Sequence, residues 1–318
     1  MKTPSTFLIF LGSLAVCGCQ TPTPSHPGIR ESITDSAYLT QKNWDDGKAE
    51  VAFYEVERYL QVDEKKTVLP SIAASILVKH DYDPIRLIKA VGFSQQKVPS
   101  FQWVFFYELD DRYATKYAFS VHAAQSNLQP LKQSFSAMSF EGNGYVELSF
   151  LPDTTIRVVN RGDRVSQPDQ IVAGRPNAYP IGLVPLLIRA LDFSEKKRLD
   201  FLAVLLNGKV IPAHATGVEP DTLRLGQSDV ACEKVVVTYE GLPRQAVGIT
   251  AYLASEETYW RSKTPNRQIL QLQSSVIETG LLGKKVRISY RMKLIEELRA
   301  AYWKEDIRAR LRRIKELP

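Results

Sequence analysis

The sequence is poor in the residues that carry most recognisable chemistry. It has three cysteines and four histidines among 318 residues. Cys17 and Cys19 lie close together near the start, so Cys232 is the one cysteine in the rest of the chain. A single cysteine cannot form an internal disulfide, and we therefore expect the fold to be stabilised by its own apolar core.

The histidines lack the spacing of a metal site. His26, His80, His122 and His214 lie far apart, without the His-x₃-His or Glu-x₂-His pattern that places two ligands on one face. We therefore predict no metal and no cofactor. The run His80-Asp81-Tyr82-Asp83 puts a candidate base beside carboxylates, but neighbours on a strand point to opposite faces. That pattern favours a loop after a strand over a catalytic site.

Signatures of nucleophilic or glycosidic catalysis are also missing. The sequence contains no Gly-x-Ser-x-Gly elbow. Cys232 has apolar neighbours such as Val235, which predicts a buried side chain and not a reactive thiolate. Asp45-Asp46 and Glu256-Glu257 are adjacent pairs, whereas a glycosidase needs two carboxylates that face each other across a cleft. We predict no enzyme; a hydrolase or transferase acting on cell-envelope glycans is the alternative.

Long apolar runs and a strong charge of one sign are absent as well. The apolar segment 7–16 is far shorter than the roughly 20 residues of a membrane-spanning helix. The formal net charge of +6 is a mild excess for a chain of this size. It slightly favours contact with anionic lipid heads or cell-wall polymers, and it gives no argument for nucleic acid as a partner.

What is present begins with the features of a secretion signal. A lysine supplies positive charge, residues 7–16 supply the apolar segment, and Val16-Cys17-Gly18-Cys19 supplies a cleavage site. This site resembles the lipobox of bacterial lipoproteins. The resemblance implies that residues 1–18 are a signal peptide and that Cys19 becomes a lipidated N-terminus. Residues 19–36, which start with a run rich in Pro, Ser and Thr, are expected to form a flexible tether.

The lipobox resemblance also implies a location. The residue after the cysteine is Gln20, and not the Asp that retains many lipoproteins in the inner membrane. No acidic residue occurs between Cys19 and Glu31 that would favour export to the cell surface. We therefore expect anchoring to the outer membrane, on its periplasmic face, through two or three acyl chains at about 0.8 kcal/mol per buried methylene. An ordinary secretory signal with two incidental cysteines is the alternative.

The remaining chain is predicted to be mainly β. Apolar and polar residues alternate from Ala49, and an aromatic-rich segment follows at 101–107. Strand patterns recur at intervals of roughly 10–15 residues, which predicts an antiparallel sandwich or open barrel. A polar break with Pro and Gly separates an N-terminal β-rich half, residues 37–165, from a C-terminal β-rich half, residues 176–292.

Two segments have helical patterns. Residues 181–193 are apolar nearly all round, which predicts a short buried helix that contains Arg189. Residues 293–318 are predicted to form an amphipathic C-terminal helix, with a stripe of Ala300, Trp303, Ile307, Leu311 and Ile314. The end of this helix is basic, with Arg308, Arg310, Arg312, Arg313 and Lys315. A solvated face favoured by the helix dipole explains these charges, and docking on anionic lipid heads is the alternative.

Short motifs in both halves resemble envelope proteins. Residues 44–51 (WDDGKAEV), with Tyr54 and Glu57, resemble an envelope lipoprotein family widespread in Bacteroidetes, whose members are sometimes labelled septum formation inhibitors. In the second half, four segments are similar to uncharacterised periplasmic β-rich proteins: 185–193, 232–235, 259–262 and 267–270. The resemblances imply a β-rich periplasmic module and assign no catalytic residue.

Aromatic residues give the most specific functional hint. Phe101, Trp103, Phe105 and Tyr107 share one face of their predicted strand, and Phe106 points to the other face. One apolar face lines the core, and the other needs a cover or a ligand. The cover is either the C-terminal helix or the second half; alternatively, the four aromatics line a cavity for a lipid-like ligand. We favour a non-enzymatic binding or scaffolding lipoprotein, and a structural partner of an envelope assembly complex is the further alternative.

Overall fold

The computed structural model describes residues 33–94, 96–108, 114–163, 167–242, 253–281 and 284–315. Ile33–Pro318 form one compact unit. All of the elements and apolar clusters below belong to Ile33–Pro318. The predicted signal peptide, and most of the predicted tether with Cys19 and His26, lie outside the described residues.

Strands dominate the described part of the chain. Its helical elements are α1 (Ser36–Leu39), η1 (Lys42–Asp45), η2 (Ile181–Leu183), α2 (Val184–Ala190) and α3 (Ile307–Lys315). Its strands are β1 (Ala49–Val62), β2 (Lys65–Asp83), β3 (Ile88–Lys89), β4 (Val98–Glu108), β5 (Lys116–Ala124), β6 (Pro130–Ser139), β7 (Gly142–Phe150), β8 (Thr155–Gly162), β9 (Gln167–Ala173), β10 (Ala178–Pro180), β11 (Arg198–Val204), β12 (Val210–Leu225), β13 (Ser228–Tyr239), β14 (Glu256–Ser262), β15 (Ile269–Ser274), β16 (Ile277–Leu281) and β17 (Lys284–Ala300).

One continuous sheet contains these strands. Following the hydrogen-bonded pairs, the order is β9-β8-β7-β6-β5-β4-β2-β1-β17-β15-β14-β13-β12-β11-β10, with β3 beside β2 and β16 beside β17. The pairs are antiparallel apart from β10–β11. In the described residues β9 pairs only with β8 and β10 only with β11, so the sheet stays open. The predicted mainly β class is confirmed, in its open form.

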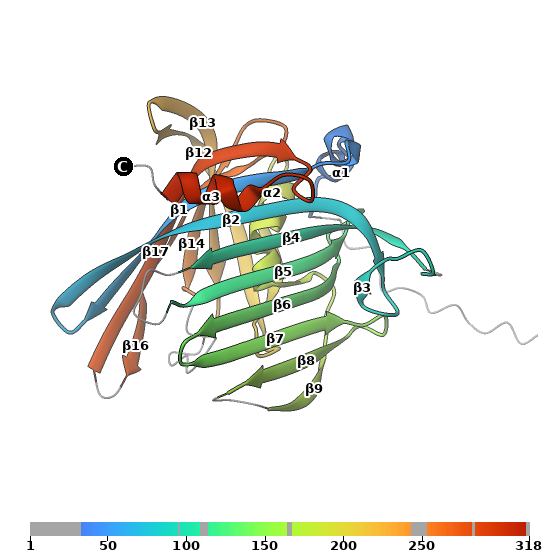
Figure 1. Ribbon diagram of the computed structural model, residues 1–318, viewed down its shortest axis with the longest axis horizontal. Coiled ribbons are helices and arrows are strands. Elements are labelled where there is room, and N and C mark those ends of the chain that lie inside the picture. Colours follow the sequence, from blue (N-terminus) through green and yellow to red (C-terminus); the bar gives the residue numbers. More distant parts are fainter. Residues whose placement is uncertain are drawn as a thin grey trace, which may run out of the picture. The chain divides into compact units, whose positions relative to one another are not determined.

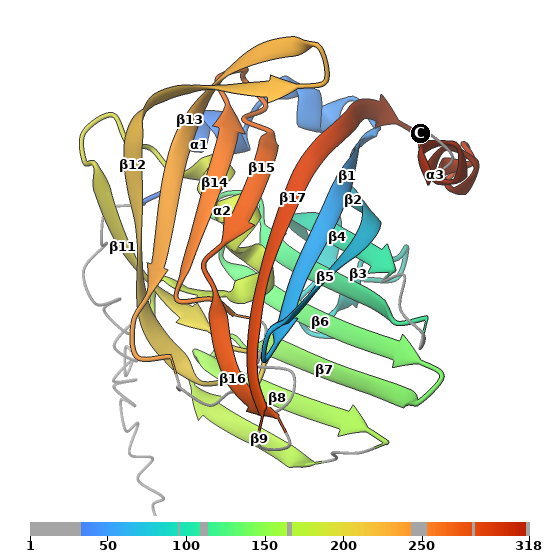
Figure 2. The same cartoon turned by 90° about the vertical axis from the view of Figure 1, so that its left-hand side faces the viewer.

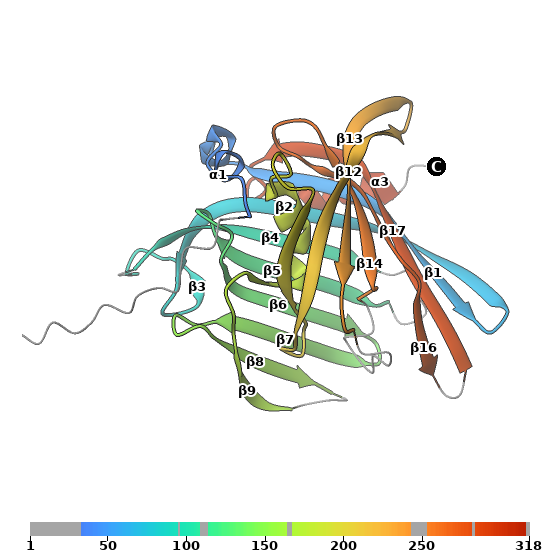
Figure 3. The same cartoon turned by 180° about the vertical axis from the view of Figure 1, so that it is seen from behind.

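The sheet curves around α2. Figures 1 and 3 show β4–β9 as one wall, and Figure 2 shows β11–β15 as the other, with α2 between them. η2 contacts β5 and β6, whereas α2 contacts β14, so this short helical segment touches both walls. The predicted break between the two β-rich halves, residues 166–175, contains the edge strand β9, after which the chain passes to the other edge strand, β10. The halves are joined by the pairing of β1 with β17.

Alternation along β1 explains how both faces of the sheet are buried. Ala52 and Tyr54 belong to the large apolar cluster that includes α2, on what we call the inner face. Val51 and Phe53 belong to a second cluster, on the outer face, together with Ile314 of α3. A strand with two apolar faces therefore has two covers, α2 inside and α3 outside.

The predicted helix at 181–193 is confirmed as η2 followed by α2. Six of the seven α2 residues are buried, in agreement with its apolar sequence. Its buried charge, Arg189, makes a two-pronged ion pair with Glu50 of β1, at 2.7 and 2.8 Å. Arg261 of β14 donates to the carbonyl oxygens of Ile188 and Leu191, at 2.7 and 2.8 Å. These hydrogen bonds supply donors for backbone carbonyls at the buried C-terminal end of α2.

The C-terminal helix is shorter than the prediction over 293–318. Residues up to Ala300 belong to β17, and α3 spans Ile307–Lys315. The strand forms because β1 needs a partner: Ala49–Val62 pair along their whole length with β17. Of the predicted stripe, Ile307, Leu311 and Ile314 pack on the outer face, while Trp303 is 53% exposed.

A candidate ligand cavity between the two walls

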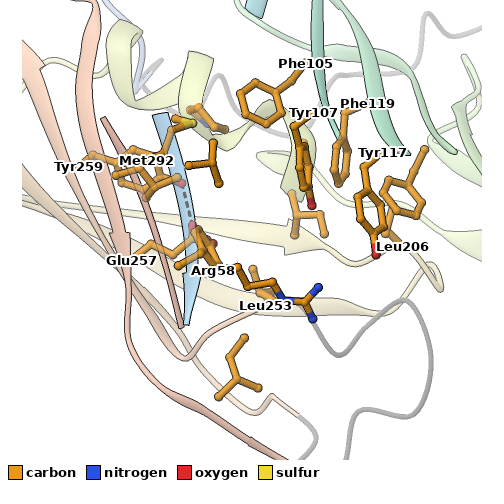
Figure 4. A pocket seen from close by; sticks show the side chains of 18 of the residues that line it. Arg58, Phe105, Tyr107, Tyr117, Phe119, Leu206, Leu253, Glu257, Tyr259 and Met292 are labelled. Atoms are coloured by element: carbon orange, nitrogen blue, oxygen red, sulfur yellow. Dashed lines mark hydrogen bonds between the residues drawn. The ribbon is translucent and has the colours of Figure 1, made fainter. Parts of the chain in front are cut away.

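A largely apolar cavity of about 200 Å³ lies between the two walls of the sheet. Figure 4 shows Phe105, Tyr107, Tyr117 and Phe119 on one side and Tyr259 and Met292 on the other. The described residues that line it are Val56, Arg58, Trp103, Phe105, Tyr107, Tyr117, Phe119, Phe135, Ile181, Gly182, Pro185, Leu205, Leu206, Leu253, Glu257, Tyr259, Leu272, Ile277, Ile288, Tyr290 and Met292. Arg58 and Glu257 are the charged members of this set.

Three of the four predicted aromatics line the cavity. Trp103, Phe105 and Tyr107 follow one another on the inner face of β4, with ring centres 5.9 and 5.8 Å apart. The indole Nε1 of Trp103 donates to Ser75 Oγ at 2.6 Å, which fixes the ring against β2. Phe101 lies farther along the same face, fully buried, with its ring centre 5.1 Å from that of Trp44 and away from the cavity.

The neighbouring strand extends the aromatic wall. Tyr117 of β5 lies opposite Tyr107 in the register, and the two rings stack with centres 4.9 Å apart. Phe119 is the register partner of Phe105, and its ring centre lies 4.6 Å from that of Phe135 on β6. Stacked and tilted aromatic pairs of this kind each add roughly 0.5–1.5 kcal/mol beyond the area that they bury.

The opposite wall comes from the second half of the chain. Leu272 of β15 and Met292 of β17 are register partners and both line the cavity. Ile288 and Tyr290 follow Met292 at alternate positions on β17 and line it as well. Sequence analysis places these residues in the C-terminal β-rich half but not in the cavity, because the pattern of one strand does not show which other strand it faces. Their alternation with Arg287, Ser289 and Arg291 does indicate that they share one apolar face of the strand.

Glu257 is the centre of a buried hydrogen-bond cluster beside the cavity. Its Oε2 accepts hydrogen bonds from the hydroxyls of Tyr239 at 2.9 Å and Tyr259 at 2.7 Å, and its Oε1 accepts one from Tyr290. Burial, reinforced by the Glu257 charge, raises the pKa of all three tyrosines well above the usual value of 10. The hydroxyls therefore stay protonated and continue to donate to the carboxylate.

The predicted Glu256-Glu257 pair is split by strand geometry. The two residues begin β14 and point to opposite faces, so Glu257 is 5% exposed while Glu256 is exposed. Glu257 is the one carboxylate among the described lining residues of the cavity. A facing pair of carboxylates, as glycoside hydrolysis requires, is thus not formed by that described lining.

The two aspartates of the other carboxylate pair form ion pairs, and the side chain of the cysteine is buried. Asp45 pairs with Lys79, and Asp46 pairs with Arg299 at 2.6 Å; both aspartates lie at the end of η1, before β1 begins. Cys232 is completely buried, and burial raises the pKa of its thiol.

The structure also locates His214 and the basic residues that the sequence assigns to the C-terminal helix. His214 of β12 lies 3.4 Å from Glu240. On α3, Arg310 pairs with Glu296, and Arg312 pairs with Asp306 at 3.6 Å. Arg308 and Lys315 lie outside the described side chains, and Arg313 is exposed.

The described residues contain no helix that is long and apolar enough to cross a membrane. They also contain no group of three or more His, Cys, Asp or Glu side chains arranged to hold a metal ion.

Two solved structures are similar to this chain. One is the crystal structure of a beta-barrel-like protein of the domain of unknown function DUF1849 from Brucella abortus; it is 11% identical, with a TM-score of 0.48, and the match covers 79% of this chain and 98% of that chain. The other is a DUF1329 family protein from Desulfovibrio piger; it is 10% identical, with a TM-score of 0.25 and coverage of 85% and 95%. The sequence matches no protein family and no curated protein.

Proposed function

We propose that this protein is a lipid-anchored envelope protein whose cavity binds an apolar ligand of the acyl-chain type. The observation that carries the proposal is the lining of the cavity, which is aromatic and aliphatic on both walls. Apolar cavities favour apolar occupants because water inside them lacks hydrogen-bond partners. The single carboxylate in the described lining is already occupied by tyrosine hydroxyls, which supports binding over hydrolysis.

The size of the cavity limits the ligand. About 200 Å³ exceeds the ~150 Å³ of an engineered apolar cavity that binds benzene. It is smaller than the roughly 300–1,000 Å³ of pockets for drug-sized molecules. A segment of one acyl chain fits these limits. Six buried methylenes, at about 0.8 kcal/mol each, would contribute roughly 5 kcal/mol before the entropic cost of association.

Native mass spectrometry of residues 29–318, expressed in a bacterial periplasm, tests the proposal. This segment contains every described element of the fold. We expect a removable adduct of lipid mass, or uptake of an added fatty acid after delipidation. Phe105→Asp should abolish it, because Phe105 lines the cavity, whereas Phe106→Asp should not, because Phe106 is on the outer face of the same strand. Ile288→Trp, which fills part of the cavity with a larger side chain, should also abolish the adduct, and it introduces no buried charge.

Two results would refute the ligand proposal. One is an apo mass in the wild-type protein that does not change when fatty acid is added. The other is an equal loss of the adduct in the Phe105 and Phe106 variants, since that would place the ligand outside the cavity. Each variant must first show the β-sheet circular dichroism of the wild type.

Cys19 is the proposed attachment site of the lipid anchor. The lipobox-like run Val16-Cys17-Gly18-Cys19 and the Pro-rich tether support lipidation at this residue, and Gln20 supports the outer membrane. Metabolic labelling of the full chain with a radioactive fatty acid should mark the wild type and Cys17→Ser but not Cys19→Ser. Label that remains in the Cys19 variant would show that Cys19 is not the lipidated residue. The motifs at 44–51 further support membership of a Bacteroidetes-type envelope lipoprotein family.

A further inference from the structure

The outer face of the sheet brings together two histidines and a tyrosine that are far apart in the sequence. His80 and Tyr82 are two residues apart on β2 and share the face opposite to Leu77, a residue of the inner cluster. His122 lies on β5, between the inner-face residues Val121 and Ala123, and therefore also points outward.

The strand between them leaves room for the three rings to meet. β4 separates β2 from β5, and its residue opposite His80 is Ser100, whose own partner on β5 is Ala124. Because Ser100 is small, the ring of His80 can lean over β4 toward His122, whose own partner on β4 is Gln102. The ring centres of His80 and His122 are 5.6 Å apart, and those of Tyr82 and His122 are 4.9 Å apart.

Four polar atoms of this cluster are buried without a hydrogen-bond partner in the described part of the chain. They are Nδ1 and Nε2 of His80, Nδ1 of His122 and the hydroxyl of Tyr82, a side chain that is completely buried. Buried polar groups are rarely left unsatisfied, and a cluster of them calls for an explanation such as a bound ion. Here the four atoms belong to three adjoining rings.

The segment after β2 covers the cluster. Asp83 accepts hydrogen bonds from the backbone N–H groups of Ile85 and Arg86, at 3.1 and 3.0 Å, which turns the chain back toward β3. Lys132 of β6, the register partner of His122, donates to the carbonyl oxygen of Leu87 at 3.4 Å. The turn is thus held over the outer face, and Figure 1 shows β3 at that end of β2.

Two lysines lie beside the cluster. Lys89 of β3 is the register partner of Tyr82, and Lys132 of β6 is the register partner of His122. The lysines weaken the attraction for a dication, and Glu147, 2.9 Å from Lys132 Nζ, offsets one of them.

We propose that His80, His122 and Tyr82 form a binding site for a divalent transition-metal ion of the copper and zinc class. Imidazole nitrogens are preferred ligands of these ions. Two imidazoles on one tetrahedral ion, with bonds of about 2.1 Å, have ring centres roughly 5 Å apart. The observed spacing of the ring centres, 5.6 Å, differs from that value by less than about 1 Å. The hydroxyl of Tyr82 supplies the third polar group.

Calorimetric titration of residues 29–318, made without a histidine tag, with Cu²⁺ and Zn²⁺ tests the site. This segment excludes His26 and retains His214 as an internal control. The wild type should bind one equivalent with a micromolar or lower Kd for Cu²⁺, the tighter of the two ions. His80→Phe and His122→Phe should weaken binding at least 100-fold and Tyr82→Phe about 10-fold. His214→Gln, on β12 beside Glu240, should leave it unchanged.

A second measurement does not depend on the folding of any variant. Electron paramagnetic resonance of the wild type with one equivalent of Cu²⁺ should show hyperfine coupling to two imidazole nitrogens. The proposal is overturned if the wild type binds neither ion below 1 mM, if the bound Cu²⁺ shows no imidazole coupling, or if His214→Gln loses binding while folded His80 and His122 variants keep it.

Discussion

The ion pair between Glu50 and Arg189 should be the most sensitive charged contact in the fold. Both side chains are almost completely buried, at 4% and 5% exposure, and the guanidinium binds both carboxylate oxygens. Arg189 also donates to the carbonyl oxygen of Asn266 at 2.7 Å. Removing one member leaves the other charge buried without its partner, which costs about 3–5 kcal/mol. We therefore expect Arg189→Met to lower the free energy of unfolding by that amount.

A double-mutant cycle measures the coupling. Glu50→Gln alone should also lower the free energy of unfolding strongly. The loss in the double variant Glu50→Gln with Arg189→Met should be much smaller than the sum of the two single losses, because no charge remains unpaired. Urea unfolding followed by circular dichroism gives each free energy. The exposed pair Arg198–Asp200, at 2.9 Å, is the control and should contribute about 0–1 kcal/mol. Additive losses at Glu50 and Arg189, or a loss below about 1 kcal/mol for Arg189→Met, would refute this reasoning.

Two further predictions follow from other buried groups. Burial, with the charge of Glu50, raises the pKa of Glu297 from 4.5 to about 7. Between these pH values the folded state holds a proton that the unfolded state releases. The free energy of unfolding should therefore fall as pH rises from about 4.5 to 7, by up to roughly 3 kcal/mol. Glu297→Gln should remove most of this fall in urea titrations at several pH values, and an unchanged slope would contradict the assignment. Cys232, the one thiol of residues 29–318, is fully buried and should react with a thiol reagent only at the rate of unfolding; rapid reaction of the folded protein would show that β13 opens locally.

The strands of the first half could be predicted because their pattern is local. Alternation from Ala49 and the aromatic run at 101–107 define faces without any knowledge of the partner strands. For the same reason Trp103, Phe105 and Tyr107 could be assigned to one face. Phe101 shares that face, but its position beside Trp44 depends on where η1 packs, and the periodicity of β4 carries no information on that contact.

The sequence does not show which distant strands pair with each other. Residues 293–300 have an apolar spacing compatible with a helix, and they form a strand because β1 lies beside them. The second wall of the cavity depends on the same pairing, since Met292 reaches it only as part of β17. His80 and His122 are 42 positions apart in the numbering, and only the β2-β4-β5 register brings their rings together. Spacing rules for metal ligands on one helix do not cover a site that is built across strands.

The central claim, that an acyl chain enters the cavity, is tested most directly by the methyl signals of methionine. Residues 29–318 contain two methionines: Met292 in the cavity and Met138, which is 53% exposed on the outer face. With ¹³C-methyl methionine and an added fatty acid, we expect the Met292 signal to shift and to show nuclear Overhauser contacts with the chain methylenes, while Met138 stays unchanged. Contacts to Met138 alone, or to neither methyl group at saturating fatty acid, would contradict the account.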